Sequence, residues 1–339
     1  MSGKTALLTL TSALLLHCSG EAPALPAMMM PMPAPGPTPP KEMPPELPQP
    51  TRLPPGTFVR IAPGRFLMGT STGDECRRTN NEDRHRVTLT HAFELSTTEV
   101  TKGQYQQLMG EDPGAFPECG ASCPVDQRSW HHAAAYANAA STYAGLPSCY
   151  LCTGSGDGQR CTARGEAGTI YACAGYRLPT EAEWEFAYRA GLDAATYKGN
   201  LTTCSELDPA MNDIAWFLRN GEGRIHEVGK KTPNALGLYD MSGNVWEWTH
   251  DLYQTSLKEA VDPVGVAVMK GDEELRILRG GSYNCLPSES RASHRSAIPG
   301  TIAALNVGFR LARTVRIVHV AVRAERPLGD RRSAQPEKQ

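Results

Sequence analysis

The chain has 339 residues, which is enough for one large domain or two of ordinary size. A hydrophobic content of 40% and a charged content of 21% are typical of a globular protein with a substantial core. The formal net charge of -2 gives no electrostatic support for binding to nucleic acid, and we expect no such partner.

The first residues have the pattern of an export signal. Lys4 precedes an apolar run from Ala6 to Leu16, which is too short to span a bilayer but has the length of a signal-peptide core. The run ends in Leu-Leu-His-Cys, which resembles a bacterial lipobox with His17 in place of the usual small residue. We therefore expect residues 1–18 to be a signal peptide. Either lipidation attaches Cys18 to a membrane, or ordinary cleavage releases a secreted protein, and both routes predict an extracytoplasmic location.

Three further segments follow from composition. Residues 19–56 are dense in proline and carry few large apolar side chains apart from a run of three methionines, so they predict an extended, semi-rigid linker. Residues 57–315 hold the periodic apolar patterns and are the predicted folded domain. Residues 316–339 form a polar, locally basic extension that we expect to be solvated.

Short strands are predicted at both ends of the folded region. Residues 58–61 and 65–68 flank a Pro-Gly turn, which is typical of a β-hairpin. Residues 87–95 alternate between apolar and polar side chains, as one strand would. Residues 307–311 predict a last strand.

Three helices have recognisable starts. A helix is expected near residues 102–109, and Ser129 is the predicted N-cap of an alanine-rich helix over residues 130–143. Thr180 followed by Glu183 is a capping box, so a third helix should begin there and end at Gly191.

The cysteines predict a disulfide framework, because an oxidising compartment favours disulfides. Of the ten cysteines, nine remain once Cys18 is set aside. This odd number predicts a thiol that is free, metal-bound or paired with another chain. Cys119 and Cys123 are expected to pair with each other.

An insert over residues 147–175 holds four more cysteines, for which two local disulfides are favoured over a zinc site. Their connectivity cannot be read from the sequence. Three cysteines are then left. Either Cys204 pairs with Cys285 and leaves Cys76 free, or Cys76 pairs with Cys204 and leaves Cys285 as a free thiol.

Six motifs occur in order between Thr57 and Arg313, and together they resemble the sulfatase-modifying-factor domain of the formylglycine-generating enzymes. The resemblance implies an α+β fold, a single C-type-lectin-like domain with little regular secondary structure and long loops. The motifs are Phe66-Leu67-Met68-Gly69, Glu99-Val100-Thr101, residues 177–185 (RLPTEAEWE), residues 243–248 (GNVWEW), Arg279-Gly280-Gly281-Ser282 and Gly308-Phe309-Arg310.

The resemblance also implies a structural calcium ion. Its ligands would be the side chains of Asp240 and Glu247 and the backbone carbonyls of Gly243 and Val245. Oxygen ligands of this kind suit a hard cation. The alternative is that Asp240 and Glu247 only accept hydrogen bonds from loop N–H groups.

The reaction of this family, oxidation of a sulfatase cysteine to formylglycine, uses oxygen and a copper(I) ion held by two cysteines about five residues apart. Cys285 matches the first cysteine, but Ser290 stands nearest the place of the second. One thiolate alone should bind copper(I) weakly. Ser282, at the catalytic centre, and Trp246 and Arg295, which line the substrate groove, match family positions; each could instead have a structural role.

Two functions remain in competition. The first is an extracytoplasmic member of the family that lacks the two-cysteine copper site and acts in binding or as an accessory, with a protein or peptide ligand such as a sulfatase segment. The second is a true copper-dependent oxidase whose second sulfur comes from elsewhere, with Cys76 as the candidate. The iron-dependent sulfoxide synthases that share the fold rank last, because their iron site requires an additional domain.

Overall fold

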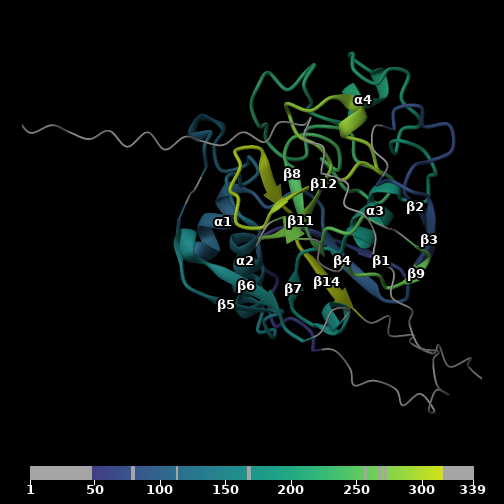
Figure 1. The fold of residues 1–339 in the computed structure, drawn as a ribbon. Helices are drawn as coiled ribbons and strands as arrows, with labels where there is room; N and C mark the ends of the chain where they lie inside the picture. The colour runs from purple at the N-terminus through teal and green to yellow at the C-terminus, as the bar shows by residue number, and fades with distance from the viewer. Residues whose placement is uncertain are drawn as a thin grey trace, which may run out of the picture.

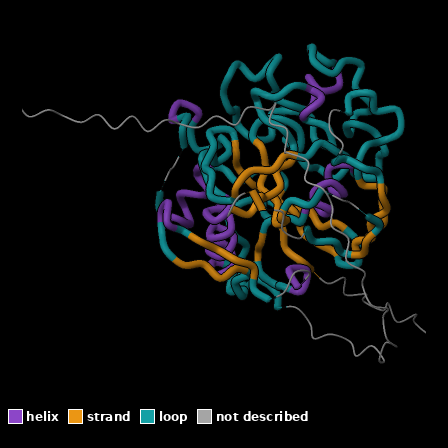
Figure 2. Tube along the Cα trace, viewed as in Figure 1, coloured by secondary structure: helices purple, strands orange, loops and turns teal. Residues whose placement is uncertain are grey.

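Short strands joined by long loops, rather than long helices, build this protein (Figure 2). The computed structural model describes residues 48–77, 81–111, 114–165, 169–255, 258–265, 269–270 and 273–315. The expected signal peptide, Cys18, most of the proline-rich linker and the C-terminal extension lie outside these residues. The α+β class expected from the sequence is confirmed.

A four-stranded sheet joins the two ends of the described region. Its strand order is β1-β4-β14-β7, and all of its pairings are antiparallel. Because the early strand β4 lies between β1 and the last strand β14, the sheet closes the domain on itself. The strands are β1 (Phe58–Ile61), β4 (Ala92–Ser96), β14 (Ala312–Val315) and β7 (Tyr176–Arg177).

A second sheet lies at the centre of the molecule (Figure 1). Its order is β10-β11-β8-β13, and β12 pairs with β11 on a separate branch. Six of the seven residues of β8 are buried, so both of its faces are covered by protein. The strands are β8 (Trp246–Leu252), β10 (Met269–Lys270), β11 (Glu273–Arg279), β12 (Ser296–Pro299) and β13 (Val307–Phe309).

Two smaller sheets complete the β-structure. One has the order β2-β3-β9 and lies on the side of the molecule away from α1 and α2 (Figure 1). The other is the hairpin β5-β6 inside the cysteine-rich insert. The strands are β2 (Gly64–Met68), β3 (His85–Leu89), β9 (Ala260–Val261), β5 (Tyr150–Thr153) and β6 (Arg160–Ala163).

The helices begin where the sequence predicts them. Thr101, Ser129 and Thr180 each cap a helix through a capping box. The third helix ends at Arg189 rather than at Gly191, because Ala190 takes the left-handed conformation with φ of 49°. The α-helices are α1 (Lys102–Met109), α2 (Trp130–Tyr143), α3 (Glu181–Arg189) and α4 (Pro209–Ile214), and the short 3-10 helices cover Pro117–Cys119, Gly156–Gly158, Thr169–Ala172 and Pro287–Glu289.

Two strand predictions need correction. The predicted hairpin of β1 and β2 does not form, because β1 pairs with β4 and β2 pairs with β3 in different sheets. The single strand expected over residues 87–95 is two strands, β3 and β4, separated at Thr90 and His91. The sequence indicated the turn between β1 and β2 but not the break between β3 and β4. In neither place did it show which strands pair, because the partners lie elsewhere in the sequence.

The disulfides agree with the framework expected from the sequence. Cys119 pairs with Cys123, and the insert closes the two bridges Cys149–Cys173 and Cys152–Cys161. The structure also pairs Cys76 with Cys204. The prediction of an unpaired thiol is wrong for the described residues, none of which is a free cysteine. Within the same residues, no helix has the length and apolar character needed to cross a bilayer.

The Cys76–Cys204 bridge should contribute more stability than the Cys119–Cys123 bridge. The first spans 128 residues and the second spans 4. Loop-closure entropy predicts about 5 kcal/mol for the long bridge and about 2 kcal/mol for the short one. Urea unfolding of the two double Cys→Ala variants measures the difference, and equal losses would contradict this ranking.

Candidate functional site

Two adjacent glycines after β11 bring the expected catalytic loop against a neighbouring segment. Gly280 and Gly281 both have positive φ, of 94° and 74°. A Cβ atom on Gly281 would lie 2.3 Å from the Ser290 hydroxyl oxygen, so no side chain fits there. The Gly-Gly pair is therefore required for the close approach of this loop to residues 289–290.

The loop collects three of the predicted site residues. The Ser282 hydroxyl lies 3.2 Å from the Cys285 sulfur and donates a hydrogen bond of 2.7 Å to the Asn284 side chain. The Asn306 side chain donates to the same hydroxyl at 3.0 Å, and the Asn306 backbone carbonyl accepts the backbone N–H of Trp246 at 2.8 Å. Asn306, which the sequence analysis did not single out, thus connects the backbone of Trp246 to Ser282. Trp246, Ser282, Cys285 and Asn306 are all buried.

The chemistry of this cluster does not fit a copper(I) site. No second thiolate is available to Cys285 among the described residues, because the other eight described cysteines are paired with one another in disulfides. Ser290 is a serine, and its hydroxyl is a hard, barely acidic ligand. Cys76, the other candidate for a second thiolate, is bonded to Cys204. The structure therefore offers no pair of thiolates at this place.

Arg295 has a structural partner. Its guanidinium makes two parallel hydrogen bonds to Glu181, of 2.6 and 2.8 Å, and the side chain is almost fully buried. Burial raises the pKa of Glu181, but the charges of Arg295 and Arg279 outweigh it and hold the pKa below its ordinary value. Arg295 thus has the structural role that the sequence analysis gave as the alternative to lining a substrate groove: it forms a buried salt bridge with Glu181.

Arg279 anchors the start of the motif in the same network. It donates to Glu181 at 3.2 Å and to Glu185 at 2.5 Å, both on α3, and to the carbonyls of Ala292 and Ser293. This one side chain therefore links the end of β11 to α3 and to the segment that follows Ser290.

Arg291 is held by Glu82, a residue that the sequence analysis did not single out. The two make paired hydrogen bonds of 2.9 and 3.0 Å, and Ser293 donates to the same carboxylate at 2.8 Å. Burial alone would raise the pKa of Glu82. The hydrogen bond from His294 and the charge of Arg291 lower the pKa by more than burial raises it, so the net shift is strongly downward.

The expected calcium ligands are only partly available. Glu247 accepts two hydrogen bonds from Arg310, of 2.6 and 2.7 Å, and one of 2.8 Å from the Trp184 indole. Both of its oxygens are therefore occupied. Asp240 accepts one hydrogen bond, from the Gly229 N–H at 2.6 Å, while no donor among the described residues bonds to its buried Oδ1 atom.

Glu99 adds a second open carboxylate beside Asp240. It is fully buried, neither of its oxygens accepts a hydrogen bond from a donor among the described residues, and its carboxyl group lies within hydrogen-bond reach of Asp240. Burial, followed by the charges of Asp240 and Glu247, raises the pKa of Glu99 well above its ordinary value. Burial likewise raises the pKa of Asp240 to about 6. Glu99 belongs to the Glu99-Val100-Thr101 motif, between β4 and α1. That position was the only sign in the sequence that Glu99 could belong to the site.

The carboxylates of this cluster outnumber its positive charges. Glu99, Asp240 and Glu247 lie around one buried arginine, Arg310, and the partly buried Lys231 also interacts with Asp240. The open oxygens of Glu99 and Asp240 are suitable calcium ligands, whereas Glu247 is not free to bind. In the described part of the chain, no group of three or more His, Cys, Asp or Glu side chains is arranged so that it could hold a metal ion.

The helix-poor α+β fold of short strands and its buried arginine–carboxylate motifs define a class of disulfide-stabilised, loop-rich domain. The chain belongs to the family with a sulfatase-modifying factor enzyme 1-like domain, whose family model matches residues 44–315. The resemblance read from the six motifs is therefore confirmed.

Relatives of this chain carry different names. A chaperone protein LppX from Paenibacillus barcinonensis is 31% identical over 188 residues, which cover 48% of this chain and 62% of that protein. A formylglycine-generating enzyme from Streptomyces coelicolor is 36% identical over 164 residues, covering 42% of this chain and 49% of the enzyme. This chain thus spans about half to three fifths of the length of these curated relatives. The solved structure of Treponema denticola variable protein 1 matches with a TM-score of 0.63 and 28% identity, over 76% of this chain and 94% of that one.

The Glu82–Arg291 pair should make stability fall in acid. The folded-state pKa of Glu82 lies below its ordinary value of 4.5, so its contribution is present above pH 4.5 and is lost as the pH falls. Glu82→Gln should cost about 3 to 5 kcal/mol at pH 7 and should flatten the pH dependence. Urea unfolding between pH 3 and 7 measures both.

Glu206→Gln is the matched control for that experiment, because Glu206 forms an exposed pair with Arg219. Its stability should stay within about 0.5 kcal/mol of the wild type at every pH. A Glu82→Gln variant with the same acid slope as the wild type would contradict the assignment.

Proposed function

We propose that this protein is an extracytoplasmic member of the formylglycine-generating enzyme family that acts by binding a protein or peptide partner, without the oxidase activity of the enzymes. The observation that carries the proposal is the lack of a second thiolate for Cys285. No cysteine stands at position 290, and the other eight described cysteines are paired with one another, so no two-thiolate copper site can form from them.

The other motif residues support the same proposal. Arg295 is neutralised by Glu181, and Trp246 is buried at 1% exposure, so neither presents a free functional group on the surface. A relative with 31% identity is named a chaperone, which is a binding function of that protein. A role of this general kind needs no redox chemistry at Cys285.

The location is part of the proposal. Four disulfides within the described residues fit an oxidising compartment. Membrane attachment through a lipidated Cys18, or secretion after ordinary cleavage, would both place the domain there.

We propose in addition that the domain takes up a structural calcium ion beside Asp240. Asp240 would bind through its open oxygen, with Glu99 as a second carboxylate and the carbonyls of Gly243 and Val245 as further ligands. Glu247 would then stabilise Arg310 at the edge of the site instead of binding the ion. A bound divalent cation would offset the excess negative charge of this buried cluster.

The purified protein should form no aldehyde on a Cys-x-Pro-x-Arg peptide in the presence of copper(I), a reductant and oxygen. The physical reason is that a single sulfur cannot supply the two-thiolate site. Mass spectrometry detects the decrease in peptide mass that accompanies conversion of the cysteine to the aldehyde. The Streptomyces enzyme is the positive control. Turnover by the wild type that disappears in Cys285→Ser would overturn the proposal and establish the oxidase instead.

Calcium should raise the midpoint of thermal unfolding. Binding to the folded state alone adds about 2.7 kcal/mol at a calcium concentration one hundred times the Kd. Asp240→Asn and Glu99→Gln should each reduce the shift, and Asp213→Asn, at an exposed carboxylate paired with Lys198, should not. Isothermal titration provides the direct measurement. A full calcium response in Asp240→Asn would refute the proposed ligand set.

A further inference from the structure

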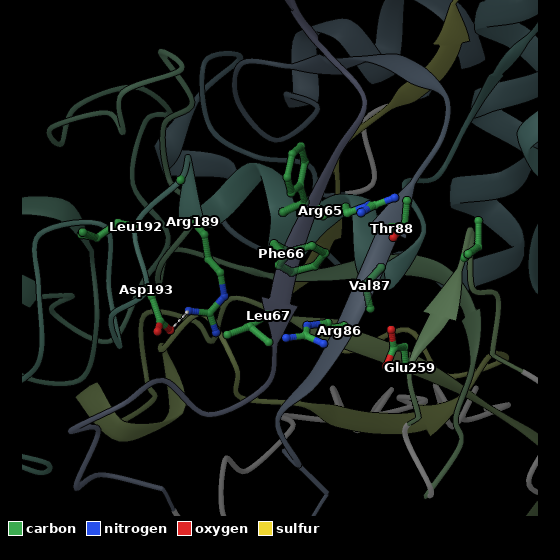
Figure 3. A pocket seen from close by; sticks show the side chains of 13 residues that line it. Arg65, Phe66, Leu67, Arg86, Val87, Thr88, Arg189, Leu192, Asp193 and Glu259 are labelled. Atoms are coloured by element: carbon green, nitrogen blue, oxygen red, sulfur yellow. Dashed lines mark ion pairs between the residues drawn. The ribbon is translucent and has the colours of Figure 1, made fainter.

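A groove of about 710 Å³ runs from the end of α3 across β2 and β3 to β9 (Figure 3). Its volume falls within the range of roughly 300 to 1,000 Å³ that is usual for small-molecule sites. None of Cys285, Trp246, Arg295 or Asp240 lines it. The groove is therefore separate from both parts of the candidate site described above.

Two arginines in the groove have no ion-pair partner among the residues that the structure describes. Arg65 and Arg86 are exposed on the outer face of the sheet, and neither forms an ion pair or side-chain hydrogen bond with any described residue. Other arginines nearby are neutralised, since Arg189 pairs with Glu185 and Arg84 with Asp193. Unpaired guanidinium groups in a groove are ready to bind an anion.

The strand register brings the two free arginines to the same place. Arg65 on β2 faces Thr88 on β3, and Leu67 faces Arg86. Arg65 and Arg86 are therefore diagonal neighbours on one face, with their Cβ atoms about 7 Å apart. Side chains of this length can converge on one oxyanion, to which each can donate charge-assisted hydrogen bonds.

Part of the groove is lined by apolar side chains. Leu67, Leu192 and Val261 are 38%, 45% and 64% exposed, and they are three of the seven large apolar side chains that stand out on the described surface. Singly exposed apolar residues are ordinary, but three in one groove beside two free arginines favour a ligand with an apolar body.

The charge of the groove sets the charge of the ligand. Glu259, which lines the groove, likewise has no ion-pair partner among the described residues, so two positive charges meet one negative charge and leave a net charge of about +1. We propose that this groove binds a small amphipathic monoanion, an apolar body that carries one carboxylate or sulfonate group. The anionic group lies between Arg65 and Arg86, and the apolar body lies against Leu67 and Val261.

The test uses anilinonaphthalene sulfonate as a fluorescent reporter and octanoate, below its micellar concentration, as the competitor. Octanoate should displace the dye, and the Arg65→Gln and Arg86→Gln variants should each weaken octanoate binding about tenfold, the loss expected for one charge-assisted contact. Octanol, which has the same apolar chain without the charge, should bind more weakly and should be insensitive to both substitutions.

Arg224→Gln is the matched control, because Arg224 is an exposed arginine whose recorded ion pair is with Glu222, outside the groove. It should leave octanoate binding unchanged. The thermal midpoints of Arg65→Gln and Arg86→Gln should equal that of the wild type, because neither side chain makes a described ion pair or side-chain hydrogen bond, so a loss of folding cannot imitate a loss of binding.

A second variant separates the two halves of the ligand. Leu67→Asn should weaken octanoate and octanol by the same factor, since it removes apolar contact and leaves both arginines in place. Three results would overturn the proposal: no displacement by octanoate, equal affinities for octanoate and octanol, or octanoate binding that the double arginine variant leaves intact. These outcomes do not depend on the aldehyde assay at Cys285.

Discussion

Buried pairs of arginine and carboxylate hold this loop-rich domain together. Arg177 binds Glu183, Arg279 binds Glu185 and Arg310 binds Glu247, and every one of these six side chains is at most 1% exposed. Each pair is stable only as a unit, because removing one partner leaves an uncompensated buried charge at a cost of about 3 to 5 kcal/mol. In this fold with few helices, charge-assisted hydrogen bonds thus hold loops and short strands in place, as the hydrogen bonds of longer helices and strands do in other folds.

The same pairs explain why the family motifs predict the fold better than the reaction. Arg279, the first residue of the Arg-Gly-Gly-Ser motif, links β11 to α3 through its hydrogen bond to Glu185. Arg310, the last residue of the Gly-Phe-Arg motif, links the end of β13 to the start of β8 through its hydrogen bond to Glu247. Gly281 admits the chain between neighbours where no Cβ would fit. A chain can therefore keep these motifs for folding after the second copper-binding sulfur is gone. Ser290 is consistent with that separation of roles.

Local signals carried the sequence predictions that succeeded. Caps such as Thr180 with Glu183 act within four residues, so the helix starts could be read directly. Two local disulfides in the insert were likewise expected, although the sequence did not show which of its cysteines pair. The predictions of strand pairing failed because a turn between β1 and β2 does not show that β1 pairs with β4 and β2 with β3. Those pairings depend on packing between segments that are distant in the sequence. The Cys76–Cys204 bridge, across 128 residues, was one of two open alternatives for the same reason.

The site divides along the same line. Ser282 and Cys285 could be placed together from one short motif, but Asn306, Glu82 and Glu99 enter only through tertiary contacts. The groove between α3 and β9 was invisible to the sequence, because Arg65 and Arg86 become neighbours only through the β2–β3 register. A one-residue shift of that register would turn one arginine inward and separate them. The proposed binding surface thus depends on a strand pairing that no local signal in the sequence specifies.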